Sequence, residues 1–484
     1  MAAKLDLNYI SYLPSAQGAW SSLDIVAAMT ANDIPNIVRL ADEFDKEHMT
    51  KGLSALYQGL KEFQPDIILG GLLSFHDLLF MSKQLDCAAL LLVLQATLPS
   101  NDVAVFGILP KMPYWTGLNM FLWRMLHEKV WDDPAKKDVA LKRRMEVYGL
   151  NEEEASQSVW EYWEYQAGPK MKEPSPCLPL LIGSSVTLNS PLPRDFTPNH
   201  IMLGPLTLPS EAQKGEQFGE GELQAVQDFI NAGPPPVYVG YGSVSCHSSK
   251  WMTLFSLRAL KLIDERAIVC SGWGGMSLDH VAGEKDEEEL KAYVEKKILF
   301  VKACSHDLIF PQCKVIVHHG GAGTFNASLR SGSPTVIAPV MVDQFCHTTF
   351  VNELGVGVGL KQMAKSVPED LAAAITKCIT SADIQTKAKE TAEKLKAENG
   401  CAKLADFLNQ YYREEVVTGK HRAKAKEVTE SVKKDLAKKT PERSWFSCLE
   451  RSPKSKSCGG KDTGGDRAVV QGHKFVNVEA KLES

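Results

Sequence analysis

The sequence predicts an α/β protein of two domains, each built around a parallel sheet. Short runs with the character of buried strands alternate with stretches of helical periodicity along most of the chain, a pattern typical of βαβ units. The chain has 484 residues and a hydrophobic content of 44%, enough for two full cores. Only the C-terminal segment departs from this composition.

The first half contains a predicted strand–helix–strand unit. Apolar side chains recur at helical spacing over residues 37–63. A strand is predicted in PDIILGG (65–71), a helix over residues 75–85, and a second strand in AALLLVL (88–94). Because two strands joined by a helix run parallel, we expect a parallel pair here. LPLLIGSSVTL (178–188) predicts a further strand.

Between Pro99 and Leu126 the sequence is rich in proline, aromatic residues and methionine. Either this stretch packs in the core, or it offers an apolar surface to a lipid ligand or a membrane.

A linker is predicted over residues 208–222, where hydrophobicity falls and Gly, Gln and Glu accumulate. It separates a domain of residues 1–207 from one of residues 223–418. The second domain alternates strands and helices, which predicts a doubly wound parallel sheet with ligands at the carboxyl ends of its strands. Its predicted strands lie in VYVGYGS, AIVCSGW, KILFV, CKVIV and PTVIAPV, and an amphipathic helix lies in KWMTLFSLRALKLI.

Charge is distributed unevenly. Residues 420–484 hold 16 Lys and Arg against 9 Asp and Glu, a net charge of +7, whereas the remainder holds 38 against 50, a net charge of −12. The acidic body argues against general nucleic-acid binding. The basic tail, residues 419–484, is predicted to be largely disordered. Trp445 and Phe446 lie there beside basic residues, so the tail either attaches to a membrane surface or is simply solvated.

Cysteine usage and the N-terminal sequence bear on localisation. The eleven cysteines are scattered and form no CxxC pair, which predicts reduced, intracellular thiols. The first residues lack the apolar run of a signal peptide. We therefore expect a cytoplasmic protein, peripheral to membranes if the tail attaches to them.

The most informative stretch is VIVHHGGAGTFNASLRSG (315–332), a predicted strand, turn and short helix. Gly320, Gly321 and Gly323 lack a Cβ, so the backbone can approach a ligand closely. The first N–H groups of the helix and its dipole favour an anion such as phosphate. Thr324 adds a hydroxyl, and His318 a directional donor.

Other interpretations of this turn are a purely structural loop or a metal site. A metal site would draw on His318, His319, His306 or His347, but adjacent histidines on a strand point to opposite faces and rarely share one ion. The turn also lacks the Walker pattern of a P-loop ATPase. We expect no metal and no cofactor.

A family resemblance rests on longer segments. CSHDLIFPQCKVIVHHGGAGTFNASLRSGSPTVIAPVMVDQF resembles the donor-binding signature of sterol and glycolipid glucosyltransferases, which use UDP-sugars. PPPVYVGYGSVS, AIVCSGWGG and LPRDFTPNHIMLGPL are similar to other segments of that family, and matching segments run from about Phe63 to about Asn409. The resemblance implies the GT-B fold, two Rossmann-like domains facing a cleft. It also implies inverting transfer of a hexosyl group, expected to be glucosyl, from a UDP-sugar to a sterol or similar lipid.

The resemblance also implies roles for individual residues. Asp343 and Gln344 match the pair that bonds the sugar hydroxyls, and Ser243 and His318 match residues at the diphosphate. Ser243 could instead cap a helix, and His306 with Asp307 either flanks the uracil and diphosphate or only caps the short helix that begins there. The donor-binding residues expected are Ser243, Ser305, His306, His318, Gly320, Gly321, Gly323, Thr324, Asp343 and Gln344.

The general base is not identified. In the family it comes from a Gly-Xaa-Arg-Gly-Asp-Val-Gln-Pro motif, which has no counterpart before Gly70. We therefore expect the opening strands of the N-terminal domain to be missing from this chain. His76 and Asp77 are the nearest candidates, and the alternative favoured over a base is a pair that starts a helix. The alternative function is a non-catalytic UDP-sugar or lipid-binding protein.

Overall fold

The computed structural model describes residues 22–71, 75–96, 98–104, 112–130, 134–156, 179–208, 213, 215–424, 426–427 and 430. These residues belong to one compact unit, Met1–Lys433. Trp445, Phe446 and the rest of the proposed membrane-attaching tail lie outside the described residues. In the part of the chain described, no helix is both long and apolar enough to cross a bilayer.

The first sheet has four parallel strands in the order β1-β2-β3-β4. The predicted strand–helix–strand unit is confirmed, and its helix has the predicted bounds. The short strand β4 was not predicted. The elements are β1 (Ile67–Gly70), α4 (Phe75–Leu85), β2 (Ala88–Val93), β3 (Leu180–Ile182) and β4 (His200–Met202).

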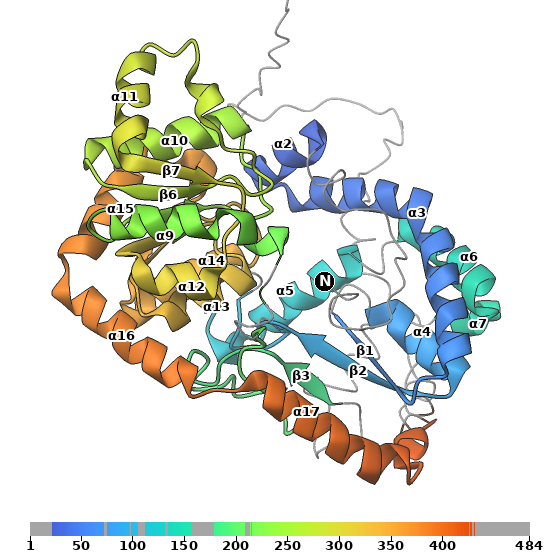
Figure 1. Ribbon diagram of the computed structural model, residues 1–484. Coiled ribbons are helices and arrows are strands. Elements are labelled where there is room, and N and C mark those ends of the chain that lie inside the picture. The colour runs from blue at the N-terminus through green and yellow to red at the C-terminus, as the bar shows by residue number, and fades with distance from the viewer. Residues whose placement is uncertain are drawn as a thin grey trace, which may run out of the picture. The chain divides into compact units, whose positions relative to one another are not determined.

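Helices surround this sheet (Figure 1). The predicted helix over residues 37–63 is part of a 30-residue helix, α3. The helical elements of this part are α2 (Leu23–Ala31), α3 (Ile34–Phe63), η3 (Tyr114–Thr116), α5 (Leu118–Val130), α6 (Pro134–Tyr148) and α7 (Glu152–Ala155).

The described residues of the aromatic stretch between Pro99 and Leu126 are partly buried and partly exposed, and contact of the exposed ones with a lipid or a membrane stays a prediction. Trp123 of α5 is buried and donates its Nε1–H to the Val103 carbonyl at 2.9 Å. By contrast, Trp115 and Phe121 are 84% and 55% exposed. One face of α5 therefore belongs to the core, and another is an apolar surface.

The second sheet has six parallel strands in the order β10-β9-β8-β5-β6-β7. This is the doubly wound order predicted for the second half, and it reverses direction between β5 and β8. The strands are β5 (Val237–Gly240), β6 (Ala267–Cys270), β7 (Ile298–Val301), β8 (Val315–His318), β9 (Thr335–Ile337) and β10 (Gly357–Gly359).

Helices cover both faces of the second sheet (Figure 1). Short 3-10 turns at Glu216–Phe218 and Glu220–Glu222 precede it, within the predicted linker, and further short turns lie at Leu278–Val281, Phe310–Gln312 and Met363–Lys365. The helices are α9 (Leu223–Asn231), α10 (Ser249–Leu262), α11 (Glu287–Lys297), α12 (His306–Ile309), α13 (Ala322–Ser331), α14 (Gln344–Leu354), α15 (Pro368–Thr380) and α16 (Ala382–Lys396).

Two helices pack against the sheet that is not their neighbour in the sequence. α17 (Gly400–Tyr411), which follows the second sheet and leads into a π-helical turn at Tyr412–Val416, packs against the first sheet, with Tyr411 in a cluster with Leu90 and Leu181 (Figure 1). α2, which precedes the first sheet, instead buries Ile25 and Met29 in the core of the second. Helical residues also continue past Gly419 to residue 424. The domain boundaries drawn from the sequence stay a prediction.

Candidate functional site

The candidate site lies between β5 and β8, where the order in which the strands of the second sheet follow one another along the chain reverses. β5 and β8 are neighbours, with Gly240 paired to His318 at their carboxyl ends. The chain leaves β5 toward α10 and leaves β8 toward α13, and α10 and α13 belong to the two different halves of the doubly wound fold. The two connections part there, and doubly wound sheets bind ligands outside the strand ends at such a point.

His318 is the last residue of β8, and its side chain points into the fold. Its ring is fully buried, and its Nδ1 accepts the Gly320 N–H at 3.0 Å. Its Nε2 lies 3.0 Å from the Thr335 hydroxyl and 3.2 Å from the Ser328 hydroxyl. Both ring nitrogens are therefore engaged within the fold. The predicted direct contact of His318 with a diphosphate stays untested, and its geometry is that of a residue that shapes the turn.

His319 has the opposite geometry. Its ring is 6% exposed, stands at 88° to that of His318, and has a buried Nδ1 that lacks a hydrogen-bond partner among the described residues. The ring lies between two turns, because a Cβ on Gly242 would come within 2.8 Å of it and one on Gly321 within 2.4 Å. A buried ring nitrogen without a partner is uncommon in folded proteins. From the sequence alone, His319 is expected only as a possible metal ligand.

The three glycines of the turn have different reasons to be glycine. Gly320 has φ +92°, and a Cβ there would meet Ile337 Cγ2 at 2.9 Å, so the fold itself requires glycine. Gly321 makes room for the His319 ring. Gly323 has an ordinary φ, and a Cβ there would meet nothing within 4 Å. Of the three, only Gly323 has open space where a Cβ would lie. A ligand-binding role for the three glycines stays a prediction.

Helix α13 begins with uncapped N–H groups. Gly321 is its N-cap residue and provides no side-chain cap, and Phe325 makes the first helical bond, to the Gly321 carbonyl at 2.8 Å. The first-turn N–H groups of Ala322, Gly323 and Thr324 therefore face outward with the positive end of the helix dipole behind them. These N–H groups form an arrangement suited to an anion.

The histidines around the turn are neutral. Burial lowers the pKa of His319 to about 4, and it lowers the pKa of His318 well below its ordinary value. His347 also has a lowered pKa owing to burial, and its Nδ1–H donates to the Gly320 carbonyl at 2.5 Å. An anion here would thus meet N–H dipoles and not imidazolium charge. Among the described residues, no three His, Cys, Asp or Glu side chains are grouped as metal ligands.

Asp343 and Gln344 stand at the start of α14, on the same side of the sheet as the turn. Gln344 is buried, and its Oε1 accepts the N–H groups of Val340 at 2.8 Å and Met341 at 3.1 Å, so its carbonyl already serves the loop. Asp343 makes no capping bond to α14, and its carboxylate accepts a hydrogen bond from Gln95 of the first sheet. Of the predicted pair, Asp343 is the freer to meet a sugar hydroxyl.

Ser243 lies exposed in the turn after β5. The alternative role as a helix cap is wrong for this residue, because α10 is capped by Ser248, whose hydroxyl accepts the Trp251 N–H at 3.0 Å. Ser243 is therefore open to a ligand at the candidate site.

The Ser305–Asp307 loop is tied to the linker. Ser305 is buried and donates to Gln213 at 2.8 Å, and Asp307 accepts from the same Gln213 at 2.5 Å. No side-chain bond caps α12, so the capping role suggested for His306 and Asp307 is not realised. His306 stacks on Phe310 with ring centroids 4.3 Å apart, and burial lowers its pKa to about 4. Contact of this loop with uracil stays a prediction.

The weak base candidates lie at the start of α4. Asp77 is 5% exposed and accepts a hydrogen bond from the Tyr148 hydroxyl at 2.8 Å. That enclosed contact agrees with the alternative, a helix-start pair that holds neighbouring helices together. The side chain of His76 lies outside the described residues. No base is assigned.

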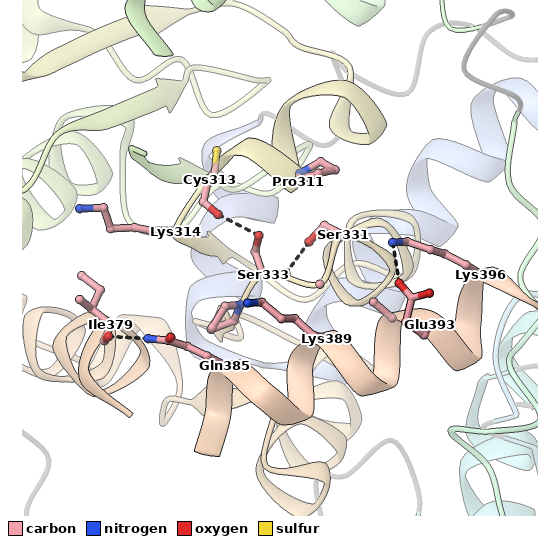
Figure 2. A pocket seen from close by; sticks show the side chains of 13 residues that line it. Pro311, Cys313, Lys314, Ser331, Ser333, Ile379, Gln385, Lys389, Glu393 and Lys396 are labelled. Carbon is pink, nitrogen blue, oxygen red and sulfur yellow. Dashed lines mark hydrogen bonds and ion pairs between the residues drawn. The ribbon is translucent and has the colours of Figure 1, made fainter. Parts of the chain in front are cut away.

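A surface cavity of about 340 Å³ lies elsewhere on the second sheet. Figure 2 shows it between α16 and the segments that enter β8 and β9, with Lys389 and Glu393 on one side and Cys313 and Ser333 on the other. Its polar groups bond one another, as Ser333 does to the Cys313 carbonyl at 2.8 Å. It stands at the amino ends of these strands, whereas the candidate site stands at their carboxyl ends.

Parts of this chain are similar to known proteins. Residues 281–410 match the family model described as Erythromycin biosynthesis protein CIII-like, C-terminal domain. A sterol 3-beta-glucosyltransferase of Arabidopsis thaliana is 32% identical over 46% of this chain, and one of Debaryomyces hansenii is 35% identical over 34% of it. The matches cover 33% and 10% of those relatives, so this chain spans a third or less of their length.

A solved structure gives the fold. The glycotransferase of kitacinnamycin superposes with a TM-score of 0.51 at 18% identity, covering 84% of this chain and 88% of the other. The two parallel sheets and this likeness confirm the predicted GT-B fold. The resemblance drawn from the sequence is confirmed as well, since part of this chain is similar to sterol 3-beta-glucosyltransferases and to a glycosyltransferase family model.

Proposed function

We propose that this protein transfers a hexosyl group, expected to be glucosyl, from a UDP-sugar to the hydroxyl of a sterol or similar lipid. Transfer would proceed with inversion and without a metal or other cofactor. The observation that carries the proposal is the uncapped start of α13, next to the buried ring of His319. The relatives named as sterol 3-beta-glucosyltransferases support the choice of donor and acceptor.

The chemistry asks for stabilisation of a departing diphosphate. The acceptor oxygen attacks the anomeric carbon of the sugar, the bond from that carbon to the β-phosphate oxygen breaks, and UDP leaves with the added negative charge. Preorganised N–H groups at a helix start stabilise such charge at no cost of reorganisation.

Recognition of the sugar would fall to Asp343. Its carboxylate can accept hydrogen bonds from sugar hydroxyls, and it makes no bond to its own helix. The acceptor hydroxyl must lose its proton to a base, which typically contributes about 10²- to 10⁴-fold to rate. That residue is the missing part of the proposed mechanism.

The proposed location is the cytoplasm, with attachment to a membrane surface through the basic tail. Scattered cysteines and the +7 charge of residues 420–484 support it. A sterol acceptor resides in membranes, so attachment would bring the enzyme to its substrate.

The test is incubation with radiolabelled UDP-glucose and ergosterol in detergent micelles, followed by extraction of labelled steryl glycoside. Product from the wild-type chain, reduced at least tenfold in Asp343→Ala, is the expected result. UDP-glucose binding by calorimetry without product for any sterol or lipid acceptor would favour the non-catalytic alternative. Failure to bind either UDP or UDP-glucose would refute the transferase and the UDP-sugar-binding protein alike, and would leave only the lipid-binding alternative.

A further inference from the structure

The carboxylate of Asp343, in the loop after β9 of the second sheet, accepts a hydrogen bond from Gln95, in the segment after β2 of the first sheet. Gln95 follows β2 by two residues, at the carboxyl end of that strand, and its Nε2–H donates to Asp343 Oδ2. The two residues are 248 positions apart in the sequence. The bond joins the strand ends of one sheet to the loop after β9 of the other.

The loop that carries Asp343 is held in a strained and specific shape. Val342, immediately before it, has φ +50°, which is unfavourable for a β-branched residue. The Gln344 side chain ties down the N–H groups of Val340 and Met341, and Gln362 donates to the Val340 carbonyl at 3.3 Å. The direction of Asp343 is thus imposed by its neighbours.

Asp343 occupies the N-cap position of α14, where an aspartate usually accepts the N–H of the first helical turn. It makes no such bond. Its carboxylate is turned from its own helix to Gln95. A neutral amide donor orients the carboxylate through one oxygen and leaves its negative charge in place. A lysine at the same position would neutralise that charge.

We propose that Gln95 is a positioning residue for the donor sugar. By holding Oδ2 of Asp343, it leaves Oδ1 directed at the sugar hydroxyls, and it makes sugar recognition depend on the segment that follows β2 of the first sheet. This inference rests on the proposed function, because it assumes that Asp343 meets the sugar. It concerns the sugar only, since neither residue belongs to the α13 turn assigned to the diphosphate.

The test compares UDP and UDP-glucose binding to Gln95→Leu by calorimetry. We expect UDP-glucose to bind about 3- to 10-fold more weakly, the range of one net hydrogen bond, and UDP to bind within about twofold of wild type. In an Asp343→Ala background, Gln95→Leu should produce no additional loss, because the two residues act through one contact. A merely structural residue would change both ligands alike.

Two further variants make the result decisive. Gln224→Leu is the matched control, because Gln224 donates to the Asp228 carboxylate at 2.8 Å on α9, away from the site, and its loss should change neither affinity. Gln95→Asn, shorter by one methylene group, should reproduce the selective loss if Gln95→Leu does not fold.

Equal loss for both ligands, tighter or unchanged UDP-glucose binding, or full additivity with Asp343→Ala would overturn the inference. If the wild-type chain binds no UDP, the proposed function fails instead. If the wild-type chain binds UDP and UDP-glucose equally, the sugar contact of Asp343 is refuted, and the inference about Gln95 is refuted with it.

Discussion

Gly323 and Gly320 lie in the same turn, but we expect replacement by alanine to affect ligand binding at Gly323 and folding stability at Gly320. In Gly323→Ala, the new methyl group would meet nothing within 4 Å, and the backbone already has an ordinary φ. Alanine is favoured over glycine in helices by about 1 kcal/mol, and less in the first turn. The free energy of unfolding should therefore stay unchanged or rise by up to about 1 kcal/mol.

Binding of UDP should respond in the opposite sense. The methyl group would stand in the space through which an anion reaches the first N–H groups of α13. Loss of one hydrogen bond to a charged group costs about 1.5–3 kcal/mol, which is at least about tenfold in affinity. Calorimetric titration with UDP, paired with urea denaturation of the same preparation, measures both quantities.

Gly320→Ala is the contrasting variant. Its left-handed φ costs an alanine about 1–2 kcal/mol, and the methyl contact at 2.9 Å with Ile337 adds overpacking, so we expect the unfolding free energy to fall by about 2–4 kcal/mol. If Gly323→Ala binds UDP as tightly as wild type, the α13 start is not the diphosphate site. If Gly323→Ala destabilises the fold as much as Gly320→Ala, the distinction between the two glycines is wrong.

Three other outcomes are expected. His318→Ala should lower the unfolding free energy by about 1–3 kcal/mol, because the Gly320 N–H loses its buried acceptor, and should weaken UDP binding by loosening the turn; unchanged UDP affinity would contradict this. Asp343→Ala should weaken UDP-glucose more than UDP in calorimetry, and an equal loss would argue against a sugar contact. Burial lowers the pKa of His200, His306 and His319 to about 4, below the unfolded value near 6.5, so their stabilising contribution is complete above about pH 6.5 and is lost as pH falls toward 4. Urea denaturation at stepped pH should show the unfolding free energy falling by on the order of 1.4 kcal/mol per pH unit for each histidine that titrates, and a flat profile would show that these rings are not held neutral.

Local periodicity alone settled much of the fold. The helix predicted over residues 75–85 has those bounds in the structure, and the apolar runs at residues 237–240 and 315–318 are strands. A run of apolar residues states that an element is buried on both faces, whatever covers it. For the same reason, the glycine turn after a strand and before a helix could be read as an anion site without knowing its neighbours.

Tertiary structure decided the rest, because it depends on which elements meet. The sequence could not tell that His318 turns into the fold while His319 keeps an unpartnered nitrogen, since both follow the same apolar run. Nor could it assign Gly320 and Gly321 to internal packing and Gly323 to open space. The burial of Met29 with the second sheet and the bond from Gln95 to Asp343 join segments far apart in the chain. Periodicity records how buried a side chain is along its own element, whereas its partner is fixed only when the topology brings distant strand ends to one edge.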